Sequence, residues 1–147
     1  AGAIFWLRSV LKLQPDHAEA LNFIGSLLAQ RGGDHDEAER LVRRALALRP
    51  DTGAFLDSLG WISFQRGDYP RAAELLERAA RLEPEEPVIL EHLGDALLRL
   101  SRPREAADAW RRALEALSLH PEFADPPDQR AILERKLKLL STDAPAR

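Results

Sequence analysis

The side chains that could perform acid–base or metal chemistry are spread thinly along this chain of 147 residues. Its four histidines lie far apart and without metal-ligand spacing on one helix: His17, His35, His92 and His120. His35 lies in "GGDHDEA", where a turn with Asp34 or Asp36 capping the next helix is the stronger interpretation. The chain has no cysteine, and "GGD" and "RGD" lack the rest of a phosphate-binding loop. The sequence therefore predicts a protein that is not an enzyme, with no catalytic residue, cofactor or metal site.

Aromatic rings with polar neighbours form a more informative pattern, in "LGWISFQRGDY" and "LNFIGSLLAQ". Trp61 and Phe64 lie in the first stretch and Phe23 in the second. Such rings are typical of protein-binding surfaces, because they offer a large contact area at a small cost in side-chain entropy. Gly60, beside Trp61, costs a helix about 1 kcal/mol relative to alanine. What these residues could do depends on the helices that carry them.

The composition is that of a globular chain without a strongly charged partner. Apolar residues make up 45% and charged residues 31%, which excludes a disordered chain. Acids and bases are interspersed and the net charge is −3, so nothing predicts binding to nucleic acid or to an anionic membrane. No apolar run approaches the roughly 18 residues of a membrane span. Abundant arginine and alanine suggest a bacterial source, and both cytoplasm and periplasm remain open.

Three segments repeat one pattern with a period of about 34 residues. Alanines recur at Ala38, Ala72 and Ala106, glycines at Gly25, Gly60 and Gly94, and prolines at Pro15, Pro50 and Pro84. Each unit contains two amphipathic helical patterns separated by turn formers, and the proline ends the unit. A helical hairpin of this kind has an apolar face too large to bury alone. Neighbouring units must therefore stack.

These motifs resemble the tetratricopeptide repeat family. The resemblance covers about residues 3–120 and rests on the leucine–x–x–leucine–glycine run, the turn glycine, the alanines seven residues apart and the closing proline. There are departures, since Ser63 stands where the family usually has an aromatic residue and Ser101 replaces the turn glycine. The resemblance implies an all-α fold, a right-handed α-solenoid of stacked helix–turn–helix units with a C-terminal capping helix.

We expect five parts along the chain. They are the second helix of a truncated unit (1–15), three complete units (16–50, 51–84 and 85–120), and a capping helix with its tail (121–147). The capping helix is predicted to start near Asp128 and to carry a stripe of Leu133, Leu137 and Leu140. The final "STDAPAR" is predicted to be a frayed tail.

The N-terminal segment "AIFWLRSVLKLQP" aligns with the second helices of the repeats. Leu7 falls in the column of Leu76, and Trp6 also falls among leucines of the other second helices, which favours the core. Trp110 is predicted to be core for the same reason. However, a segment without its partner helix would leave Ile4, Phe5 and Trp6 uncovered, and exposed apolar surface of that kind indicates an interface.

First helices of such units line a concave surface, which solenoids use for binding. The side of each first helix opposite its leucines can be located by its offset from the glycine. This predicts a peptide-binding groove formed by Asn22, Phe23, Ser26, Gln30, Asp57, Ser58, Trp61, Phe64, Gln65, Glu91, His92, Asp95 and Arg99. The acids favour a ligand with basic or amide-donor groups, and a clamp for a terminal carboxylate is disfavoured because Asn22 alone is of a suitable type.

Two functions from different classes remain after these considerations. The first is a non-catalytic scaffold that binds a peptide segment of a partner protein in the groove, with Trp61 as its principal anchor. The alternative is a structural segment of a longer solenoid that self-associates through the exposed N-terminal helix, as a homo-oligomer.

Overall fold

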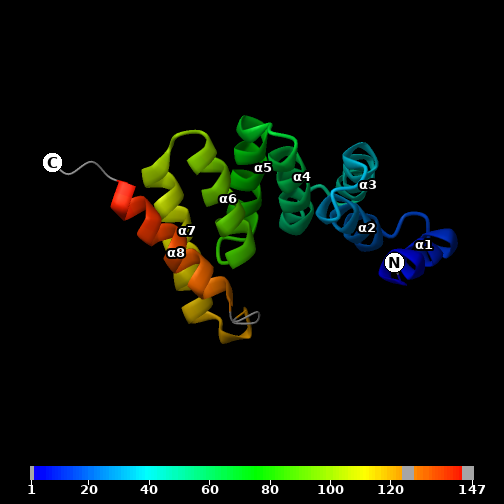
Figure 1. Ribbon diagram of the computed structural model, residues 1–147. Helices are drawn as coiled ribbons and strands as arrows, with labels where there is room; N and C mark the ends of the chain where they lie inside the picture. The colour runs from blue at the N-terminus through cyan, green and yellow to red at the C-terminus, as the bar shows by residue number, and fades with distance from the viewer. Residues whose placement is uncertain (1, 124–127, 144–147) are drawn as a thin grey trace.

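The computed structural model of the chain describes residues 2–123 and 128–143 (Figure 1). Within those residues it has eight α-helices, one short 3₁₀ helix and no strand. The helices are α1 (Gly2–Leu13), α2 (Ala18–Gln30), α3 (His35–Leu48), α4 (Gly53–Gln65), α5 (Tyr69–Leu82), α6 (Pro87–Arg99), α7 (Pro103–Leu119), η1 (Pro121–Phe123) and α8 (Asp128–Asp143). Helices α1 to α7 follow one another along an extended row, and α8 lies beside α7 (Figure 1). No helix in the described part of the chain is long and apolar enough to span a membrane.

The helices pack as three hairpins, α2 with α3, α4 with α5, and α6 with α7. Each second helix also packs against the first helix of the next hairpin, and α2, α4 and α6 contact one another in succession. This arrangement is the predicted all-α solenoid. Of the two candidate caps in the first turn, Asp34 is the N-cap of α3, and its carboxylate accepts a hydrogen bond from the Glu37 amide at 3.0 Å.

Close approach within each hairpin depends on the glycine of the first helix. A Cβ atom added at Gly94 would lie 2.3 Å from Nε1 of Trp110, and one at Gly60 would lie 2.9 Å from Cγ of Leu76. Real side chains do not tolerate such distances, so glycine lets the two helices pack. Trp110 is 2% exposed, which confirms that it is a core residue.

The turns between the paired helices share one backbone conformation. Gly32 has φ 64° and Gly67 has φ 81°, and Ser101 occupies the same left-handed region at φ 59°. This region is costly for any residue with a Cβ atom. Ser101 therefore keeps the turn geometry of the repeat without the residue that suits it.

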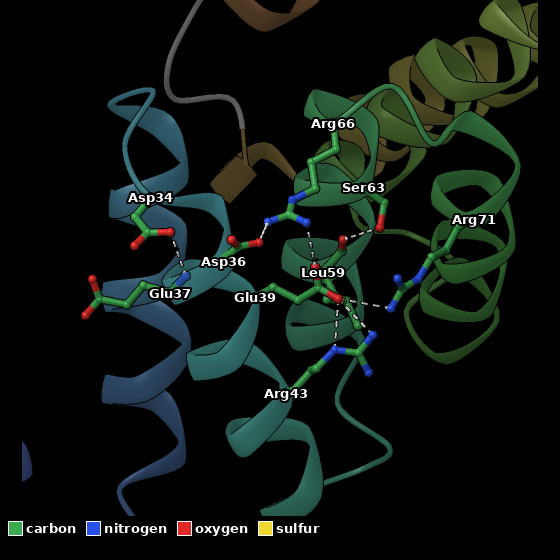
Figure 2. Close-up of polar contacts among 9 residues, drawn as sticks. All are labelled: Asp34, Asp36, Glu37, Glu39, Arg43, Leu59, Ser63, Arg66 and Arg71. Atoms are coloured by element: carbon green, nitrogen blue, oxygen red, sulfur yellow. Dashed lines mark hydrogen bonds and ion pairs between the residues drawn. The ribbon is translucent and has the colours of Figure 1, made fainter.

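Ser63, where the family usually has an aromatic residue, is buried in α4. Its hydroxyl donates a hydrogen bond to the Leu59 carbonyl at 3.1 Å (Figure 2). A buried polar group costs little when it is paired in this way. The departure from the family pattern is thus accommodated inside the helix itself.

The N-terminal helix α1 differs from the other second helices. None of its described residues is buried, and Trp6 is 71% exposed, so the prediction that Trp6 is a core residue was wrong. Leu7 is only half-buried although it aligns with the fully buried Leu76. A second helix is normally covered by the first helix of its own hairpin and by that of the next. In the described part of the chain α1 packs mainly against α2 and reaches α3 through the Arg8–Glu37 ion pair, which leaves Phe5 exposed as well.

At the other end, α8 packs against α7. Leu133 is fully buried, and Leu137 and Leu140 pack against the core as half-buried residues, so the predicted stripe is confirmed. The helix continues to Asp143, so residues 141–143 are helical rather than part of a tail. The rest of the predicted tail lies outside the described residues.

Candidate functional site

Every predicted groove residue lies outside the core, either exposed or half-buried. Phe23 is the most open of the rings, with 55% of its surface exposed. Gln30, Gln65 and Arg99 are exposed as well, and the remaining residues are half-buried. The leucines on the other side of the same helices are in the core, for example Leu90. The amphipathic pattern of α2, α4 and α6 thus places these side chains together on one face of each helix.

A stack of rings joins α4 to α6 in the middle of the groove. The Trp61 indole stacks on Phe64 with ring centroids 4.5 Å apart and on His92 of α6 with centroids 4.0 Å apart. Phe64 in turn meets the edge of Tyr69 at 5.2 Å, and the Arg99 guanidinium lies 5.0 Å from the Tyr69 ring centroid. Trp61 therefore holds two repeat units together, besides any contact that it could make with a ligand.

Polar contacts run between successive first helices at the same positions. His92 Nδ1 lies 2.8 Å from Asp57 Oδ1. The Ser26 and Ser58 hydroxyls lie 2.9 Å apart. Because Ser58 donates its proton to the Ala54 carbonyl at 3.1 Å, Ser26 is the donor of this pair. These contacts hold the polar side chains of the first helices in place.

Asn22 Oδ1 is a buried acceptor at the N-terminal end of the groove. It has no hydrogen-bond partner among the described residues. A buried polar atom without a partner costs roughly 1–3 kcal/mol. Asn22 Oδ1 is therefore a buried acceptor of the predicted groove that the described residues leave unpaired.

Two of the predicted groove acids already bind a cation from α8. Lys136 Nζ lies 2.7 Å from Glu91 Oε2 and 2.8 Å from Asp95 Oδ1, and Gln129 donates to Glu91 Oε1 at 3.2 Å. Burial raises the pKa of Asp95, and the hydrogen bond from Lys136 offsets this only in part. Burial acts to lower the pKa of Lys136, but its hydrogen bonds to Asp95 and Glu91 outweigh that effect and raise it. Breaking this half-buried contact would leave the two acids of α6 without their cation.

Sequence reasoning missed both Lys136 and Tyr69 as parts of this site. A signal for Lys136 existed, because it is a cation inside the stripe of Leu133 and Leu137. A lysine at such a position requires an acidic partner. Tyr69 gave no comparable signal, since it is the first residue of a second helix and reaches the groove only because α5 begins beside Phe64.

A polar cluster lies between the first two complete units (Figure 2). Glu39, with 17% of its side chain exposed, lies 2.8 Å from Arg43, 3.3 Å from Arg71 and 3.6 Å from Arg66. Arg66 also pairs with Asp36. Burial would raise the pKa of Glu39, but Arg43, Arg71 and Arg66 together hold it below its usual range. The Glu39–Arg43 pair lies within α3, and the contacts of Glu39 with Arg66 and Arg71 link α3 to the second complete unit.

The described residues contain no group of three or more histidines, aspartates and glutamates placed to hold a metal ion. The carboxylates of the groove are instead engaged by His92 and Lys136. The geometry thus consists of aromatic and acidic side chains on three successive first helices, α2, α4 and α6.

A family model described as Tetratricopeptide repeat matches residues 7–51, 27–87 and 91–125. These matches extend over most of the chain and over all three hairpins. The chain therefore belongs to the tetratricopeptide repeat family.

Individual proteins resemble it in part of their sequence or in fold. The TPR repeat-containing protein PA4667 of Pseudomonas aeruginosa is 45% identical over 60 residues, which are 41% of this chain and 10% of that protein. The Yersinia enterocolitica type III secretion chaperone SycD, solved with a peptide of the translocator YopD, matches with a TM-score of 0.72 at 21% identity, over 84% of this chain and 92% of SycD. PcrH, solved with the chaperone-binding region of PopD, matches with a TM-score of 0.75 at 20% identity, over 87% of this chain and 93% of PcrH. The last two likenesses show a shared fold.

Proposed function

We propose that the chain is a non-catalytic interaction module that binds a peptide segment of a partner protein along α2, α4 and α6. The observation that carries this proposal is the continuous aromatic and polar face that these helices leave outside the core. It is supported by the solved complexes of SycD and PcrH, which share the fold and hold segments of other proteins. An extended concave surface is how stacked repeats commonly bind.

The chemistry of the groove suggests what the segment contains. Phe23 offers an exposed ring to a ligand, whereas Asn22 Oδ1 is buried and cannot be reached unless its side chain moves. Asp57 shares its carboxylate with one partner, His92. Carboxylates in the predicted groove favour ligands with basic side chains and N–H donors, whereas a terminal carboxylate would find few suitable partners there.

The groove can be tested with peptides selected from a random display library on the wild-type chain. We expect the enriched peptides to be rich in lysine, arginine and apolar residues. They should bind Phe23→Ala and Asp57→Asn at least tenfold more weakly than wild type. Leu82→Ala is the matched control, because Leu82 is also an exposed apolar residue but lies on the second helix α5. Peptides that bind all four proteins equally would place recognition elsewhere and contradict the proposal.

A second candidate function is favoured by the exposed face of α1. Phe5 is 66% exposed, and Trp6, Val10 and Leu13 are exposed on the same helix. Apolar surface of this kind is typical of protein contacts, so self-association through α1 would make the chain a structural or oligomerisation segment. We expect Phe5→Glu to convert an oligomer to a monomer in light scattering, whereas Leu82→Glu leaves it unchanged. A wild-type monomer at high concentration would contradict this function.

A further inference from the structure

We propose that Glu91 and Asp95 form a lysine-binding site for an amphipathic helix of a partner, and that α8 occupies this site in the free protein as an exchangeable internal ligand. The inference rests on the proposed groove function and adds the chemistry of the partner and a way to regulate its access.

The contact between Lys136 and the two acids is built as a recognition site. The ammonium group donates to Glu91 Oε2 at 2.7 Å and to Asp95 at 2.8 and 3.1 Å. It also lies 5.7 Å from the ring centroid of Trp110. Two carboxylates and one aromatic face around a single ammonium match a primary amine in both charge and geometry.

Lys136 lies in the buried stripe of α8, between Leu133 and Leu137. An ammonium at such a position would disrupt packing against an apolar surface, but here the surface supplies the acids of α6. The helix that fits this end of the stack therefore needs leucines with a lysine among them. Residues 133, 136, 137 and 140 show the required spacing, which is that of helices seated in grooves.

Helix α8 buries fewer of its residues than α6, the helix that supplies the two acids. Leu133 is the one buried side chain among its described residues, whereas α6 has seven buried residues. Much of α8 faces solvent, including Ile132 at the surface. Because so little apolar area holds α8, a partner helix of the same pattern can replace it at a small cost.

The partner that fits is a basic amphipathic helix rather than an extended or acidic segment. Two acids must be neutralised when α8 leaves, and a segment without a lysine would leave Glu91 and Asp95 half-buried and unpaired. Lys136 is thus a specificity-determining residue. A partner helix must bind this site more favourably than α8 does in order to replace it.

The experiment uses the full chain and a fluorescent synthetic peptide of residues 128–143 as the competing helix. Binding is measured by anisotropy for wild type, Lys136→Glu and Lys138→Glu. Charge reversal at Lys136 faces Glu91 and Asp95 and expels α8, so this protein should bind the peptide at least tenfold more tightly than wild type. Lys138→Glu is the matched control, since the Lys138 side chain is exposed and forms no ion pair within the described residues, and it should behave as wild type.

A second peptide, with glutamine in place of Lys136, should bind Lys136→Glu at least tenfold more weakly than the native peptide. Equal binding of the two peptides, or equal affinity of the three proteins, would overturn the proposal. Hydrogen exchange on wild type gives a measurement that does not depend on the variant's folding. The amides of α8 should exchange at least tenfold faster than those of α5, and equal protection would also overturn it.

The outcomes separate this inference from the groove proposal. The peptide of residues 128–143 replaces α8 and has no contact with Phe23. Phe23→Ala should therefore leave the affinity for this peptide unchanged. If the peptide of residues 128–143 does not replace α8 while the selected peptides still require Phe23, the groove proposal stands alone. If the selected peptides bind Phe23→Ala as tightly as wild type while the peptide of residues 128–143 replaces α8, the lysine site stands alone.

Discussion

The central hairpin α4–α5 and the N-terminal helix α1 carry the same repeat pattern and end in opposite environments. Seven residues of α4 and six of α5 are buried, whereas none of the described residues of α1 is. The central hairpin has helices on both sides, α3 and α6, and α1 has α2. A position in the repeat thus predicts burial only where helices cover both sides of it.

The comparison is sharpest for two leucines in one repeat column. Leu76→Ala should lower the free energy of unfolding by about 2–5 kcal/mol, because it empties a fully buried site in the centre of the stack. Leu7→Ala should cost less than about 1 kcal/mol, since Leu7 is half-buried. Urea denaturation followed by circular dichroism measures both. Equal losses would mean that α1 is covered as well as α5.

Two tryptophans give the next largest difference. Trp61→Ala should cost about 2 kcal/mol, because it removes the stacks on Phe64 and on His92 and so uncouples α4 from α6. Trp6→Ala should leave the melting temperature almost unchanged and should reduce self-association if α1 is an interface. Thermal melts and light scattering on both variants provide the measurement. A stable Trp61→Ala protein would show that the ring stack contributes little to the fold.

Two turn residues, Ser101 and Gly67, should give a smaller change in the free energy of unfolding. Ser101→Gly should raise the free energy of unfolding by about 1 kcal/mol, because glycine adopts a φ of 59° without the penalty that serine incurs. Gly67→Ala, at φ 81°, should lower it by about the same amount. The pair is compared by chemical denaturation. If Ser101→Gly is destabilising, the left-handed turn has a role beyond backbone geometry.

Ion pairs should show the smallest difference between the two regions. Glu39→Gln should cost about 0.5 kcal/mol at pH 7, and Glu37→Gln, whose partner Arg8 is exposed, should cost almost nothing. Because the folded-state pKa of Glu39 is lowered, its contribution is present above the unfolded pKa and disappears as pH falls through the folded pKa. Stability measured from about pH 5 downward should therefore fall less steeply for Glu39→Gln than for wild type. Parallel pH profiles would contradict the role assigned to Glu39.

Much of the fold could be predicted because its signals are local and periodic. The repeated columns predicted the hairpins, and the leucine column predicted the burial of Trp110, both of which the structure confirms. The error at Trp6 has a physical reason. Its column is defined by helices with two neighbours, and α1 has one such neighbour in the described chain.

The candidate site could be predicted only in outline. The offsets from the glycines located side chains that do lie outside the core, but they could not show that Trp61 already stacks on His92. Nor could they show that Lys136 neutralises Glu91. Those partners are about 30 to 45 residues apart, and no local pattern connects them.

The sequence by itself determined that this chain is a stack of helical hairpins, because helix period, turn residues and small residues at helix contacts are encoded within each unit of about 34 residues. The tertiary structure alone decided which polar and aromatic groups of one unit meet those of the next, and which apolar faces stay uncovered. Both depend on how neighbouring helices pack across the unit boundaries and at the ends of the stack. There the repeat specifies a surface but not what lies against it.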